Sequence, residues 1–170
     1  MLARSATIIK WVLYALAGLA CAVVQAAVLQ RFTLWGVIPF VFPILVAVLG
    51  MYEGPLPASV YALTVGVLCD LLLPASIPCF YTLIFPLVGL SAGLLSQSLI
   101  PAGYLCSAAA SLPAYLLTGV FHCIVLWATG HAAWTAGLSV TLRELCVSLP
   151  WSLPMAWLFR KVYRRVHIDD

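Results

Sequence analysis

The sequence predicts an all-α integral membrane protein, a six-helix transmembrane bundle that forms a single domain over residues 1–170. Of the 170 residues, 65% are hydrophobic and 8% are charged, and the mean hydropathy is +1.13. Soluble domains have roughly 45–50% apolar and about 25% charged residues, so this chain has too few charges to cover a surface in water. Six apolar runs follow one another with very short connections, which leaves no room for an extramembrane domain.

Each predicted helix is an apolar run of about the length that crosses a hydrocarbon core, bounded by Pro, Gly or a rare charge. The first run is long enough to span, so it is interpreted as an uncleaved membrane helix and not as a signal peptide. The second contains Pro39 and Pro43, and the sixth begins beside a charged pair, so these two are the least regular. The predicted helices cover residues 8–29, 35–51, 57–73, 78–100, 102–129 and 142–159.

The basic residues predict the orientation of the bundle. Arg4 and Lys10 lie near the start of the first helix, and four more cations lie in the tail over residues 160–170, namely Arg160, Lys161, Arg164 and Arg165. Six helices place both ends on one side, and the positive-inside rule makes that side the cytoplasm. The tail is expected to anchor the chain at the cytoplasmic face and to contact membrane lipid. In a membrane chain the net charge of +3 therefore does not indicate a nucleic-acid partner.

Asp70 is one of only five acidic residues, and it lies about one turn from the outer end of the third predicted helix. An aspartate costs about 2.5–3.5 kcal/mol at the centre of a membrane helix and less near the interface. Gly66 lies one turn earlier on the same face. We therefore predict a close-approach surface that ends in a polar group, which either docks a partner or forms hydrogen bonds at a helix end, and we do not expect a proton carrier.

Small residues at helical spacing mark two further faces, which are predicted either to pack the bundle or to dock a partner helix. They are Gly18, Ala22 and Ala26 in the first helix, and Gly89 and Gly93 in the fourth.

The residues that most enzymes need are missing from the sequence. No acid, Lys or Arg lies at the middle of a predicted helix, and no HExxH, GxSxG or phosphate-binding motif is present. His122 is the one titratable group well inside a helix, and a lone histidine is more often a packing residue. Arg143 and Glu144 are polar candidates near the outer face. The six cysteines have no paired spacing. We predict no catalysis, no metal site and no cofactor.

The run over residues 51–100 resembles the central region of the MreD family of rod shape-determining membrane proteins. The similar features are the Glu53-Gly54 turn, the Gly66…Asp70 helix end and an aromatic-rich helix with Gly89 and Gly93. The segment over residues 143–165, with its acid, prolines and basic residues, is more loosely similar. The proline-rich loop over residues 71–79 departs from the family, which commonly has a glycine there.

The resemblance implies a non-catalytic scaffold in the bacterial cell (inner or plasma) membrane. Such a scaffold would bind MreC, and through the complex MreB, RodA and the elongation penicillin-binding protein, and would support lateral peptidoglycan synthesis and cell shape. The family also resembles in fold the substrate-binding S-components of energy-coupling-factor vitamin transporters, so an S-component is the alternative function. In that case Asp70, Glu144, Arg143, Trp134, Trp35 and Tyr81 are candidates to line an outer pocket. A third, weaker hypothesis, a lipid-precursor flippase, requires a hydrated, charge-lined cavity that the sequence does not indicate.

Overall fold

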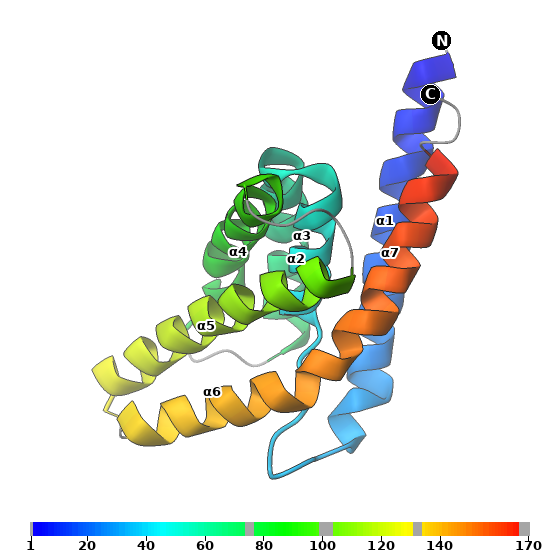
Figure 1. Cartoon of the computed structure of the whole chain (residues 1–170). Coiled ribbons are helices and arrows are strands. Elements are labelled where there is room, and N and C mark those ends of the chain that lie inside the picture. The colour runs from blue at the N-terminus through cyan, green and yellow to red at the C-terminus, as the bar shows by residue number, and fades with distance from the viewer. Residues whose placement is uncertain (1, 74–76, 99–103, 131–133, 167–170) are drawn as a thin grey trace.

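The structure, a computed structural model, describes residues 2–73, 77–98, 104–130 and 134–166. Within these ranges the chain is helical and contains no strand apart from one isolated bridge between Leu34 and Val37. The α-helices are α1 Leu2–Ala27, α2 Phe42–Glu53, α3 Pro55–Leu72, α4 Phe80–Ser98, α5 Tyr104–Ala128, α6 Trp134–Ser148 and α7 Ser152–Val166 (Figure 1).

Four helical segments of the described ranges are long and apolar enough to cross a membrane. They are Thr7–Arg31, Pro55–Leu72, Phe80–Gln97 and Cys106–Ala128. By contrast, α2 has 12 residues and a length of about 18 Å at 1.5 Å per residue, well short of a hydrocarbon core of about 30 Å. The protein is therefore a multi-pass membrane protein whose long helices surround a shorter one.

The second helix begins later than predicted. Residues 32–41 precede α2 as an irregular segment, in which Trp35 and Gly36 have φ angles of 54° and 77°. These angles form a turn that no helix accommodates. Gln25 of α1 then satisfies the backbone of the segment, because its side chain donates to the Pro39 carbonyl at 2.7 Å and accepts from the Val41 N–H at 3.0 Å. An apolar run was thus mistaken for a helix.

The predicted helix over residues 142–159 is wrong as one element. Its residues belong to two helices, α6 and α7, which meet at the 3-10 turn Leu149–Trp151. Pro150 lies in this turn and has no N–H for a helical hydrogen bond, and its ring clashes with the preceding turn of a continuous helix. Figure 1 shows the bend, with α6 beside α5 and α7 beside α1. The predicted helix limits at 100 and 102 lie outside the described residues, as does the end of the tail over residues 167–170.

The core of the molecule is formed around α2. Every residue from Phe42 to Met51 is buried, as expected of a helix that is apolar on all sides. Helices α3, α4, α5 and α7 pack against it, whereas α1 packs chiefly along α7. In the latter contact the rings of Tyr14 and Phe159 are stacked with centroids 5.5 Å apart.

Glycines bring α3 and α4 into close contact. A Cβ atom on Gly66 would lie 2.7 Å from the Tyr81 carbonyl oxygen, and one on Gly93 would lie 2.5 Å from the Pro55 Cα. Gly89 faces the backbone of α3 in the same way. Real Cβ atoms do not approach backbone this closely, so the three glycines serve helix packing within the chain.

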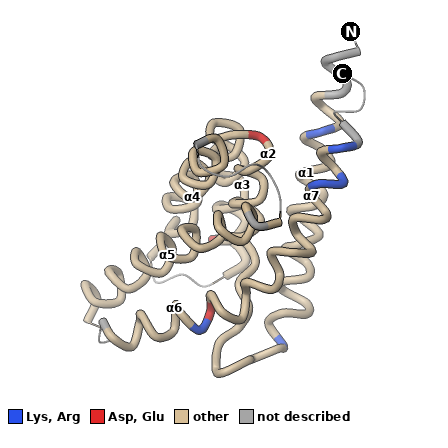
Figure 2. Tube along the Cα trace, in the orientation of Figure 1, with Lys and Arg blue, Asp and Glu red and all other residues tan. Residues whose placement is uncertain are grey.

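Basic residues gather at one end of the molecule. Figure 2 shows Lys and Arg on the first part of α1 and the last part of α7, two helices that lie side by side in Figure 1. At this end Lys10 forms an ion pair with Glu53, the last residue of α2, and the Tyr14 hydroxyl donates to the same carboxylate at 2.7 Å. This link ties α1 to the core. Arg31, which follows the other end of α1, and Arg143 of α6 are exposed.

Candidate functional site

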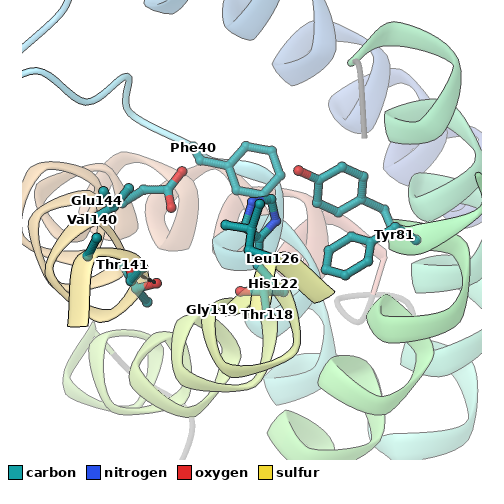
Figure 3. Close-up of a pocket in the computed structure, with 12 residues that line it drawn as sticks. Phe40, Tyr81, Thr118, Gly119, His122, Leu126, Val140, Thr141 and Glu144 are labelled. Carbon is teal, nitrogen blue, oxygen red and sulfur yellow. Dashed lines mark hydrogen bonds between the residues drawn. The ribbon is translucent and has the colours of Figure 1, made fainter. Parts of the chain in front are cut away.

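A cavity of about 270 Å³ lies between α4, α5, α6 and the segment before α2. Its wall combines aromatic side chains, Phe40, Phe80 and Tyr81, with polar ones, His122 and Glu144 (Figure 3). Two threonines, Thr118 and Thr141, complete the polar part of the lining.

Close packing of α5 against α6 brings the polar residues together. Gly119 of α5 lies against the Thr141 side chain, and a Cβ atom at Gly137 of α6 would lie 2.7 Å from the Cys123 Sγ. His122 follows Gly119 by three residues, and Glu144 follows Thr141 by three, so each shares a helix face with a contact residue. The small residues therefore bring the histidine of one helix near the carboxylate of the other.

The aromatic side chains form a continuous wall. The Phe40 and Tyr81 ring centroids are 5.4 Å apart, and Phe80 meets Tyr81 edge to face at 5.2 Å. Phe80 also meets the His122 ring edge to face at 5.6 Å. Spacings of 4.5–7 Å are favourable for aromatic pairs, so these rings hold one another in place.

Hydrogen bonds fix the position of Phe40, two residues before the start of α2. Its N–H donates to the Ser148 hydroxyl at 2.9 Å, and its carbonyl accepts from the buried Tyr115 hydroxyl. Ser148 is the last residue of α6, and Tyr115 belongs to α5. The irregular segment is thus attached to both helices that form the other side of the cavity.

Three polar groups face the cavity without a hydrogen-bond or ion-pair partner among the described residues: the Glu144 carboxylate, the Tyr81 hydroxyl and the His122 imidazole. Figure 3 shows the Glu144 carboxylate and the Tyr81 hydroxyl pointing inward from opposite sides. By contrast, Thr118 and Thr141 donate to carbonyls of their own helices. The cavity therefore presents free acceptors, one of them a carboxylate, in an otherwise apolar wall.

Asp70 does not line this cavity. Its carboxylate accepts from the Tyr81 N–H at 3.1 Å, the Thr82 N–H at 2.9 Å and the Thr82 hydroxyl at 2.6 Å. The first N–H groups of a helix have no partner within it, and a carboxylate also interacts favourably with the positive end of the helix dipole. Asp70 at the end of α3 thus caps the start of α4 across the intervening loop.

The remaining predicted residues are dispersed. Gly18 and Ala22 are buried and Ala26 is exposed. Arg143 is exposed and does not line the cavity, although its neighbour Glu144 does. Trp35 is 73% exposed. Of the tail cations, Arg160 lies over the Tyr104 ring at 5.6 Å and Lys161 over the Trp157 ring at 5.1 Å, and Arg164 is exposed. The side chains of Arg165 and Trp134 lie outside the described residues.

A second concave feature, of about 340 Å³, is a groove between α1 and α3. Tyr61 of α3 bridges the two helices, because its hydroxyl donates to the Tyr14 carbonyl at 3.0 Å and lies beside Gly18. The phenol ring acts as a spacer that leaves the groove open. Its outward rim includes Val60 and Leu19, which are 65% and 55% exposed.

The sequence analysis placed Glu144 and Tyr81 together in one candidate outer pocket, and both line the cavity, but it did not include His122 in that set. It missed Phe40, Phe80, Thr118 and Thr141 as lining residues. The sequence contained one signal: His122 follows Gly119 by three residues, and Glu144 follows Thr141 by three. That spacing identifies a cavity only once the two helices are known to be neighbours.

Comparison with protein-family models, with curated proteins and with solved structures finds no significant match for this chain.

Proposed function

We propose that this protein is a non-catalytic membrane scaffold of the MreD type in the bacterial cell-elongation machinery. In this role it binds the membrane-spanning helix of MreC and, through that complex, acts with MreB, RodA and the elongation penicillin-binding protein in lateral peptidoglycan synthesis. The observation that supports the proposal is the open, mostly apolar groove between α1 and α3, two helices that are each long and apolar enough to cross a membrane.

The groove has the properties that helix association in lipid requires. Lipid tails are as apolar as leucine, so association depends on close packing and on hydrogen bonds between helices. The small, exposed Ala15 provides a shallow notch on α1. Thr64, on the facing side of α3, has a hydroxyl that donates to the Tyr61 carbonyl at 2.7 Å and can still accept a hydrogen bond. Packed helices lie 8–10 Å apart, and the notch lets a third helix approach to that distance.

The proposal includes a topology. The end of the bundle with Lys10, Arg160 and Lys161 faces the cytoplasm, in agreement with the positive-inside rule. The bundle as a whole is proposed to have the six-helix arrangement of S-components, with α6 and α7 together taking the place of the sixth helix.

The test fills the groove with a large side chain. Val60→Trp is expected to lower co-purification of MreC at least tenfold in mild detergent and to leave the abundance of the protein in the membrane unchanged. Leu83→Trp is the matched control, since Leu83 of α4 is 71% exposed and does not line the groove. If V60W retains MreC as well as L83W does, the groove is not the docking site.

A second candidate function, the vitamin-transporter S-component, is favoured by the cavity with its free polar groups. S-components bind a small molecule near the outer face, and the cavity has a carboxylate, a hydroxyl and an imidazole that are free to bind one. Deletion of the gene distinguishes the two functions. Rounded cells support the scaffold, whereas loss of vitamin uptake in cells of normal shape supports the S-component.

A further inference from the structure

We propose that the cavity between α4, α5 and α6 binds an organic ammonium group, held between the Glu144 carboxylate and the aromatic wall. The inference rests on the second candidate function only in taking the cavity as a ligand site. It does not depend on MreC binding, which concerns a different surface.

The carboxylate provides the charge preference of the cavity. Glu144 is half-buried and points into the cavity, and within the described part of the chain no cation lies within ion-pair distance of it. Taking an ionised carboxylate out of water is costly unless a partner of opposite charge compensates for it. A bound cation supplies that partner, whereas an anion or a neutral sugar leaves the carboxylate uncompensated.

The aromatic wall determines which kind of cation is bound. The faces of Phe and Tyr rings attract a cation within about 6 Å of the ring centroid, and aromatic cages bind organic ammonium ions in this way. Tyr81 lies on the side of the cavity opposite Glu144 (Figure 3), and its ring contacts those of Phe40 and Phe80, which also line the cavity. A metal ion in a protein is usually held by several His, Cys, Asp or Glu side chains, and the described residues contain no group of three of these.

The size of the cavity limits the ligand to a small group. A volume of about 270 Å³ corresponds to roughly nine water molecules at about 30 Å³ each. An ethanolamine or choline group fits this space. The Tyr81 hydroxyl and the His122 imidazole accept hydrogen bonds from the N–H groups of an ethanolamine ammonium, whereas the quaternary nitrogen of choline has no N–H and is held by the carboxylate and the rings. The same chemistry occurs in a phosphatidylethanolamine headgroup and in a free organic cation.

The experiment measures binding to purified, delipidated protein in a neutral detergent. Ethanolamine and tetramethylammonium are titrated by calorimetry. In parallel, native mass spectrometry compares retention of phosphatidylethanolamine with that of phosphatidylglycerol carrying the same acyl chains. Glu144→Gln removes the charge at nearly constant shape. Val140→Trp keeps the carboxylate and fills the cavity, since Val140 lines it and is 48% exposed. Arg143→Gln is the control, because it changes a neighbouring charge outside the cavity.

The wild type is expected to bind at least one ammonium compound at least tenfold more tightly than either E144Q or V140W does, and R143Q is expected to stay within twofold of the wild type. Preferential retention of phosphatidylethanolamine identifies the ligand as a lipid headgroup, whereas binding of the free compounds alone identifies a soluble cation. The proposal is overturned if E144Q binds as the wild type does, or if the wild type binds neither free ammonium compound and also retains phosphatidylglycerol as well as phosphatidylethanolamine.

The groove between α1 and α3 and the cavity between α4, α5 and α6 are expected to respond to different substitutions. V60W should lose MreC and keep ammonium binding, whereas E144Q should lose ammonium binding and keep MreC. If vitamin uptake depends on the protein but no ammonium compound binds, the second candidate function stands and the ligand class proposed here is wrong.

Discussion

Replacement of Asp70 by alanine distinguishes a capping role from a docking role. Asp70 accepts hydrogen bonds from the Tyr81 N–H, the Thr82 N–H and the Thr82 hydroxyl, so D70A leaves these three donors at the start of α4 without their acceptor. Loss of a helix cap costs about 0.5–2 kcal/mol, and loss of the negative charge at a helix N-terminus costs about 0.3–1 kcal/mol. We therefore expect D70A to lower the free energy of unfolding by about 1–3 kcal/mol.

The assay is reversible unfolding in mixed micelles with increasing fractions of sodium dodecyl sulfate, followed by loss of helical circular dichroism. Asp70→Asn is the graded control. Its amide keeps one acceptor oxygen but loses the charge, so D70N should lie between the wild type and D70A. MreC co-purification is measured on the same variants under conditions in which they remain folded.

The capping explanation predicts that both Asp70 variants retain MreC once they are folded. If D70A unfolds like the wild type and fails to bind MreC, Asp70 is a docking residue and the capping argument is refuted.

Three further predictions concern contacts within the bundle. Gly93→Leu is expected to abolish accumulation of the folded protein in the membrane, because even a Cβ atom there would lie 2.5 Å from the backbone of α3; wild-type levels on immunoblots would contradict the packing role. Lys10→Glu and Glu53→Lys should each lower the melting temperature. The double exchange reforms the ion pair with reversed charges, so it should restore at least half of that loss. If the losses of the two single variants simply add up in the double variant, the ion pair contributes nothing to stability. Gln25→Leu should lower the free energy of unfolding by about 1–3 kcal/mol, because it leaves the buried Pro39 carbonyl and the Val41 N–H without their partner. An unchanged free energy of unfolding would show that other contacts hold the segment before α2.

Part of the fold could be predicted because it depends on local composition. The long apolar runs between Pro, Gly and charged residues predicted helices close to α3, α4 and α5. The same reasoning failed at Trp35, since hydrophobicity does not distinguish an apolar irregular segment from a helix. The backbone there is satisfied by Gln25, which is 14 and 16 residues away from its two partners. Pro150 is visible in the sequence, but the apolar residues on both sides of it form one run of the length of a membrane helix, so hydropathy alone does not show the break.

The candidate site was less predictable, because it depends on which helices are neighbours. Asp70 was identified as the most informative acid, and its partners lie only 11 and 12 residues away, across one loop. The cavity needs Tyr81 from α4, His122 from α5 and Glu144 from α6. The spacing within one helix determines which residues share a face, but it contains no information about which face of another helix lies opposite.

The sequence by itself indicated that this is a membrane protein, and it gave the approximate number of long helices. Both follow from the free energies of transferring apolar and charged side chains between water and lipid. The tertiary structure alone decided the roles of the polar residues. For Asp70 the sequence left two roles open, docking a partner or forming hydrogen bonds at a helix end, and it caps α4 because glycines bring α3 against α4. Glu144 faces a cavity only because Gly119 and Gly137 let α5 and α6 meet. Small residues determine which helices pack together, because they make the two helix surfaces complementary in shape. That complementarity belongs to the folded surfaces and cannot be read from either helix alone.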